Sequence, residues 1–99
     1  MKLKTIDVNA KEWFDKKNGN SYFSAKITIN YGNKYSESFI HLPFQYGYGD
    51  HYNDMAFQEL IKLGLIKNNK ERQSYWQYYR DNNIIYRYSK QEDCKKKDL

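Results

Sequence analysis

The sequence predicts one α+β domain, an antiparallel sheet in β-β-β-α-α-β order with two helices packed on one of its faces. Apolar and polar residues alternate at period two over residues 23–31, and an apolar stripe at helical spacing runs through residues 51–63. Strand-like segments also stand apart from helix-like ones along the chain, as is typical of α+β proteins. A length of 99 residues suits a single domain. We expect the compact domain to span residues 1–90 and residues 91–99 to form a disordered tail, because the tail shows no periodicity.

Three strands are predicted at residues 6–14, 23–31 and 35–44. Asn18-Gly19 lies between the first two and accepts positive φ, which favours an antiparallel hairpin. Pro43 cannot donate a ladder hydrogen bond, so we expect it to end the third strand.

The first helix is predicted at residues 51–63, with Asp50 as its capping residue. Tyr52, Ala56, Leu60 and Leu63 form its apolar stripe, and Gly64 stands where a left-handed closing residue belongs. Asn68, followed three residues later by Glu71, resembles a capping box and predicts a second helix from residue 68 to about residue 80. Residues 81–83 end this helix, and residues 84–88 alternate as a fourth strand.

The composition is unusually aromatic for a small domain. The chain has 11 tyrosines, 5 phenylalanines and 2 tryptophans, whereas isoleucine, leucine and valine together supply 15 residues. We therefore expect rings rather than aliphatic side chains to fill the core, with tyrosine hydroxyls at its rim. Tyrosines in excess of what one core can bury also favour a homodimer.

The positive charge is concentrated in the second part of the chain. Residues 61–99 hold ten Lys and Arg against five acids, whereas residues 1–60 hold seven of each. This asymmetry indicates an acidic or phosphate-bearing partner and argues against an acidic imitation of DNA.

Cysteine and histidine are too few for several kinds of site. One cysteine excludes an internal disulfide, and two histidines with it do not make a zinc site, so no metal or cofactor is expected. No apolar run reaches the length of a transmembrane helix, and no hydrophobic stretch follows the N-terminal lysines to make a signal peptide. We expect a cytoplasmic protein without a membrane partner.

Two segments carry candidate binding residues. The glycine-rich segment 46–52 offers Tyr46, Tyr48, His51 and Tyr52 for stacking on a ligand, or else forms a tight turn whose tyrosines plug the end of the sheet. On the second predicted helix, Arg72, Trp76 and Arg80 share one line beside Tyr79 and suit a nucleotide. Alternatively, Trp76 and Tyr79 face the sheet while the arginines extend into solvent.

A catalytic role is less well supported. Asp50 and Asp54 share a helix face and His51 lies beside them, which gives a possible acid–base pair for a small hydrolase. Acids in a first helical turn commonly stabilise the helix dipole, and His51 has no nucleophile next to it in sequence. We therefore do not expect an enzyme.

The stretches Trp13-Phe14-Asp15-Lys16 with Asn18-Gly19-Asn20-Ser21-Tyr22, and Phe44-Gln45-Tyr46-Gly47-Tyr48-Gly49-Asp50-His51-Tyr52 with Ala56, resemble small bacteriophage-encoded proteins. The likeness covers residues 10–63 and implies an origin, with no site residue attached to it. It suggests an accessory counter-defence protein in the cytoplasm of a bacterial host, which inhibits a host immune complex such as CRISPR-Cas or sequesters its nucleotide signal.

Three hypotheses follow. The first is a non-enzymatic binder of a host defence protein, of a nucleoprotein complex, or of a cyclic nucleotide held between protomers. The second is a DNA- or RNA-binding module that uses the basic C-terminal half, and the third is a small nucleotide hydrolase.

Overall fold

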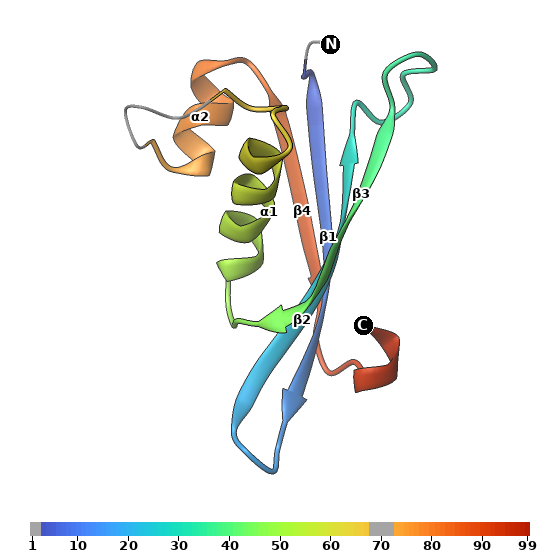
Figure 1. The fold of residues 1–99 in the computed structure, drawn as a ribbon, viewed down its shortest axis with the longest axis vertical. Helices are drawn as coiled ribbons and strands as arrows, with labels where there is room; N and C mark the ends of the chain where they lie inside the picture. Colours follow the sequence, from blue (N-terminus) through green and yellow to red (C-terminus); the bar gives the residue numbers. More distant parts are fainter. Residues whose placement is uncertain (1–2, 68–72) are drawn as a thin grey trace.

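The protein is a four-stranded sheet with two helices on one face. The computed structural model describes residues 3–67 and 73–99. The elements are β1 (Thr5–Asp15), β2 (Asn20–Ile29), β3 (Ser38–Tyr46), α1 (His51–Lys62), α2 (Tyr75–Asp81), β4 (Ile85–Gln91) and a short 3₁₀ turn, η1 (Lys96–Asp98). Figure 1 shows α1 and α2 on one side of the sheet and η1 on the other. The predicted α+β class and element order are confirmed.

The sheet is mixed rather than wholly antiparallel. Its strand order is β3-β2-β1-β4, and β4 pairs with β1 in parallel, with Thr5 opposite Ile85. Parallel neighbours need a crossover connection, and α1 supplies one by returning the chain along the sheet after β3. β4 therefore starts at the same end as β1, where the Ile85 N–H donates to the Lys4 carbonyl oxygen at 2.9 Å.

The predicted hairpin between β1 and β2 is confirmed. Gly19 has φ +70°, and its N–H donates to the Asp15 carbonyl oxygen at 2.7 Å. The Asp15 carboxylate accepts the Asn18 side-chain amide at 2.8 Å, and this hydrogen bond leads the contacts that lower the pKa of Asp15. The turn pairs Asp15 with Asn20 and so fixes the register of the whole hairpin.

The third strand does not end at Pro43. The ladder passes from Phe23 opposite Gln45 to Ala25 opposite Leu42, so Pro43 and Phe44 together face one residue of β2. This is a β-bulge on an edge strand, where proline costs no ladder hydrogen bond. The extra residue moves the side chains that follow it to the other face of the sheet.

Helix α1 begins and ends close to the predicted residues. Tyr52, Ala56 and Leu60 are buried against the sheet as expected, whereas Leu63 follows the last helical residue and is exposed. Gly64, at φ +78°, donates its N–H to the Ile61 carbonyl oxygen, and the Leu65 N–H donates to the Leu60 carbonyl oxygen, which confirms the Schellman stop.

The predicted side-chain cap at the start of α1 is wrong. The Asp50 carboxylate makes no capping hydrogen bond, and the Asn53 N–H donates to the Asp50 backbone carbonyl oxygen instead.

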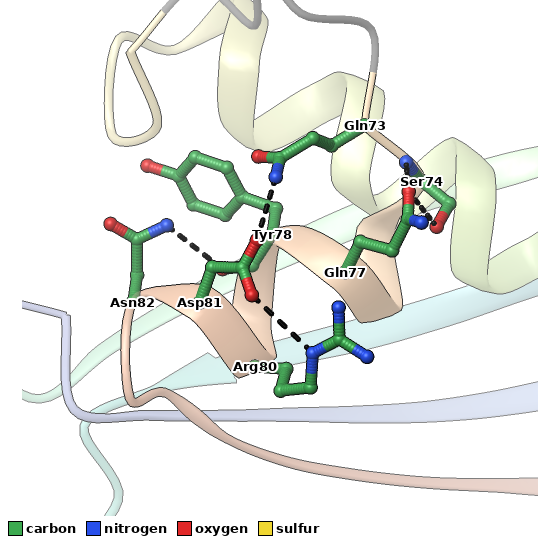
Figure 2. Close-up of polar contacts among 7 residues, drawn as sticks. All are labelled: Gln73, Ser74, Gln77, Tyr78, Arg80, Asp81 and Asn82. Carbon is green, nitrogen blue, oxygen red and sulfur yellow. Dashed lines mark hydrogen bonds and ion pairs between the residues drawn. The ribbon is translucent and has the colours of Figure 1, made fainter.

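Helix α2 is shorter than predicted. It begins after Ser74, whose N–H and hydroxyl both donate to the Gln77 side-chain oxygen at 3.2 Å (Figure 2). The signal for this start is Ser74-x-x-Gln77, whereas the predicted Asn68–Glu71 box lies outside the described residues. The helix ends as predicted. Asn83 takes φ +57°, and the Ile84 N–H donates to the Tyr79 carbonyl oxygen at 2.8 Å.

The centre of the core is mainly aliphatic. The buried apolar side chains are Ile6, Val8, Ala10, Phe23, Ala25, Ile27, Ile29, Leu42, Tyr52, Ala56, Phe57, Leu60, Ile66 and Tyr79. The expectation that rings fill the core is wrong at its centre, because β1 and β2 place their small and branched residues there. Most rings gather instead in two groups at the edges of the sheet.

One of these groups joins α2 to β4. Tyr79 packs against Tyr86 with ring centroids 4.7 Å apart and against Phe57 of α1 at 5.6 Å. The Tyr86 hydroxyl donates to Oδ1 of the buried Asn53. Within residues 3–67 and 73–99, Tyr79 carries the buried side-chain oxygen that lacks a hydrogen-bond partner.

The Tyr86 hydroxyl has a hydrogen-bond partner and the Tyr79 hydroxyl has none in the described residues, so replacing each tyrosine by phenylalanine should have opposite effects on stability. Tyr79→Phe removes an unpaired buried hydroxyl, so it should raise the free energy of unfolding by about 1 kcal/mol. Tyr86→Phe leaves Asn53 without its donor and should lower that free energy by about 1–3 kcal/mol. Urea unfolding of both variants checks this, and a loss of stability in Tyr79→Phe would show that its hydroxyl has a partner.

The C-terminal segment contacts the rest of the fold at several points. The Cys94 N–H donates to the Glu12 carbonyl oxygen at 2.9 Å, and Cys94 is half-buried. Lys90 forms ion pairs with Glu12 at 3.0 Å and Glu92 at 3.5 Å. Burial lowers the pKa of Lys90, but the two carboxylates outweigh this effect and hold that pKa above its ordinary value.

None of the described helices has the length and apolar character needed to cross a membrane.

Candidate binding surface

One face of the sheet carries neither α1 nor α2, and the short turn η1 lies on this side (Figure 1). On β1 and β2 the side chains alternate, so Ile6, Val8 and Ala10 face the helices while Asp7, Asn9 and Lys11 face away. Two shallow hollows on this open face draw side chains from all four strands, among them Asn9, Lys26, His41, Phe39, Arg87 and Ser89. We call this side the open face.

Four aromatic rings form a cluster on the open face near the β1–β2 hairpin. Trp13 and Tyr22 are cross-strand partners with ring centroids 5.6 Å apart, and Tyr22 stacks on Phe44 at 5.0 Å with an interplanar angle of 9°. Tyr46 meets Tyr22 edge-on at 5.9 Å. Phe44 is 40% exposed and Tyr46 57% exposed. We call Trp13, Tyr22, Phe44 and Tyr46 the ring cluster.

The bulge in β3 brings two of these rings onto the open face. Before it, Ile40 and Leu42 point toward the helices; after it, Gln45 lies opposite the buried Phe23, and Phe44 and Tyr46 point the other way with Tyr22. Without the extra residue the parity of β3 would place these two rings against α1.

Lysines lie beside the Trp13 end of the ring cluster. The Lys96 ammonium of η1 lies 5.6 Å from the centroid of the Trp13 ring, within the range of a cation–π contact. A hollow of about 530 Å³ beside it is lined by Trp13, Phe14, Lys16, Asp93, Cys94, Lys95 and Lys96. Farther along the open face, the Lys26 ammonium lies 4.6 Å from the centroid of Phe39. Two lysine–ring contacts therefore lie on this side of the sheet, one at Trp13 and one at Phe39.

Three of the predicted site residues lie together. Tyr46, Tyr48 and His51 line a hollow of about 370 Å³ with Gly47 between them. Tyr48 is 70% exposed, and His51 packs edge-on against the buried Phe23 at 6.2 Å. Tyr46 belongs both to this hollow and to the ring cluster, so the two surfaces are continuous.

Two predicted site residues are in the interior. Tyr52 and Tyr79 are buried in the core, where they pack between the helices and the sheet. Loss of solvation raises the pKa of both hydroxyls. Their rings hold the fold together and have no free face for a ligand.

The remaining predicted residues involve α2. Trp76 is 54% exposed, and the Arg80 guanidinium lies 5.8 Å from its ring. Figure 2 shows Arg80 directed at Asp81, whose carboxylate it meets at 3.3 Å and which also accepts the Gln73 amide. Because α2 begins at Tyr75, the predicted line of three residues is reduced to Trp76 and Arg80, and Arg72 lies outside the described residues.

The two predicted groups do not form one site. His51 begins α1, whereas α2 lies beside the far end of that helix (Figure 1). Twelve helical residues span about 18 Å, so the 46–51 hollow and the Trp76–Arg80 pair are separate surfaces.

The acid–base residues of the hydrolase hypothesis are exposed to solvent. Asp50, His51 and Asp54 are all exposed at the start of α1. Among the residues that the structure describes, no group of three His, Cys, Asp or Glu side chains is placed to hold a metal ion.

Sequence reasoning missed three members of the ring cluster: Trp13, Tyr22 and Phe44. The signal for the first two was present, because a hairpin turn that pairs residues 15 and 20 necessarily puts Trp13 opposite Tyr22. The position of Phe44 on the open face depends on the β-bulge, and Pro43 was the residue in the sequence that could have indicated a bulge there.

The chain matches no protein family, and comparisons with curated proteins and with solved structures found no match either.

Proposed function

We propose that the protein is a non-enzymatic accessory binding protein that captures its partner through exposed aromatic side chains. The ring cluster is the observation that carries this proposal. Rings that are stacked on one another and held by paired strands lose little conformational freedom on binding, so they present contact area at low entropic cost. The phage-like segments, within residues 13–22 and 44–56, suggest that it is a counter-defence factor whose partner is a component of a host immune system.

The position of the phage-like segments supports the proposal. They contain the whole hairpin with Trp13 and Tyr22 and the whole loop with Phe44, Tyr46 and Tyr48. Both come together at one end of the sheet, where Tyr22 contacts Phe44 and Tyr46.

Affinity capture from the bacterial host tests this function. Tagged wild-type protein should retain a partner that Tyr46→Ala loses to a large extent, because Tyr46 is exposed in the centre of the proposed surface. Tyr35→Ala is the matched control, since Tyr35 is 92% exposed and lies in the turn before β3. Equal retention of the partner by both variants would show that the ring cluster is not the binding surface.

A further inference from the structure

We infer that the open face binds single-stranded nucleic acid, with bases stacked on the ring cluster and phosphates held by the lysines around it. This inference rests on the proposed function and names its ligand. Unpaired bases stack on exposed aromatic rings of a sheet surface, and each such contact contributes substantially to affinity for any sequence.

The rings have the geometry that stacking needs. Tyr22 and Phe44 are almost parallel, at 9°, and Trp13 is tilted only 28° from Tyr22. These three rings therefore stack on one another in a row across β1, β2 and β3, and a base can add at the outer end of the row, on Phe44, or on Tyr46 beside it. Phe44 and Tyr46 are the most exposed members, so the row is accessible from the side of β3. Phe39, 58% exposed farther along the same strand, extends the row of rings across the open face.

The charge around the rings suits a polyanion. The hollow beside Trp13 and the larger sheet hollow together are lined by the lysines 11, 16, 26, 95 and 96 and by the aspartates 93 and 98. Five positive charges against two negative ones give these hollows a net positive charge, which favours the binding of a phosphate-bearing polyanion. The other cation on the face, Arg87, is paired with Asp7 at 2.7 Å and contributes less.

Two ring–lysine pairs repeat the same arrangement. Lys96 lies over Trp13 and Lys26 over Phe39, so each places an ammonium group next to a ring face. A base that stacks on such a ring takes the place of the ammonium group, and the flexible lysine can then reach the phosphate of the same nucleotide. A duplex offers phosphates but no free base faces, so the surface should prefer single strands.

The test is fluorescence anisotropy with labelled oligothymidine, oligouridine and a DNA duplex. We expect both single strands to bind more tightly than the duplex, and the affinity to fall steeply with added salt, with a slope of about −0.7 per phosphate contact. Trp13→Ala and Tyr46→Ala should each weaken single-strand binding by roughly tenfold, and Trp13→Phe should restore most of it. Lys96→Gln should reduce the salt slope by about 0.7.

A third ring–lysine pair supplies the matched control. The Lys34 ammonium lies 5.8 Å from the centroid of the Tyr35 ring in the turn before β3, and neither residue lines the two hollows of the open face. Lys34→Gln and Tyr35→Ala should leave both affinity and salt slope unchanged. If Trp13→Ala fails to fold by circular dichroism, Tyr46→Ala still decides, because its exposed ring contributes little to the core.

The outcomes separate this inference from the proposed function. Absence of single-strand binding, or binding that the ring variants do not weaken, overturns the nucleic-acid assignment. If oligonucleotides fail to bind while a host protein is captured in a Tyr46-dependent way, the proposed function stands and the ligand is a protein. Loss of oligonucleotide binding only in Trp76→Ala would move the site to α2 and overturn the placement on the open face.

Discussion

A Gly47→Ala variant should unfold at a clearly lower urea concentration than the wild-type protein. A Cβ atom on Gly47 would lie 2.6 Å from the Phe23 ring and 2.7 Å from the His51 ring. His51 is exposed and can move, but Phe23 is buried in the core. Forcing Phe23 aside should lower the free energy of unfolding by about 1–3 kcal/mol.

A neighbouring glycine provides the control. Gly49 has φ +60° and open space around it, and asparagine tolerates this backbone conformation. Gly49→Asn should therefore have a small effect on the free energy of unfolding. Wild-type stability in Gly47→Ala would mean that the loop is not packed against Phe23, and the hollow that joins Tyr46 to Tyr48 would lose its structural basis.

The protein should also lose stability steeply in alkaline solution. Burial raises the pKa of Tyr79 and Tyr86, and the same cause raises the pKa of Tyr52 and Tyr75. The folded state therefore keeps protons that the unfolded chain releases at its ordinary pKa of about 10. Their contribution is complete below that pH and is lost as the pH rises above it.

The slope of this loss can be measured. Each tyrosine that stays protonated only in the folded state costs about 1.4 kcal/mol of stability per pH unit above about 10. Tyr79 and Tyr86 together should lower the free energy of unfolding by about 3 kcal/mol per pH unit above about 10. Urea unfolding at several pH values measures this slope, and Tyr79→Phe should remove one of the two contributions. Part of the tyrosinate absorbance should appear together with the loss of far-ultraviolet circular dichroism. Complete ionisation of all 11 tyrosines in a protein that keeps its circular dichroism would contradict the buried ring group.

Local signals predicted the local structure well. Asn18-Gly19 set the hairpin and its register, and Gly64 with Leu65 set the end of α1, because each depends on the backbone freedom of a few residues. Helix α2 starts later than predicted for the same local reason, since Ser74 and Gln77 form the hydrogen bonds at its N-terminus.

Features that depend on distant contacts were not predictable in this way. The parallel pairing of β4 with β1 is decided by how far α1 carries the chain along the sheet. For the candidate site, Tyr46, Tyr48 and His51 were found from the glycine pattern and do lie together. Tyr52 and Tyr79 were proposed as ligand residues, but both are buried, as the apolar stripe of the first helix and the alternative orientation of the second helix predicted.

Phe44 illustrates the same limit at the binding surface. Simple alternation along β3 from Ile40 and Leu42 would put it against the helices, and only the bulge at Pro43 places it on Tyr22. The open face and its row of rings therefore become visible only once the strands are paired.

The most direct measurement is nuclear magnetic resonance mapping of the bound oligothymidine on the ¹⁵N-labelled protein. We predict the largest chemical-shift changes at Trp13, Tyr22, Phe44 and Tyr46 and at the lysines beside them, with α2 unaffected. Changes confined to Trp76 and Arg80, with the ring cluster unmoved, would contradict the central claim that the open face of the sheet is where this protein holds its ligand.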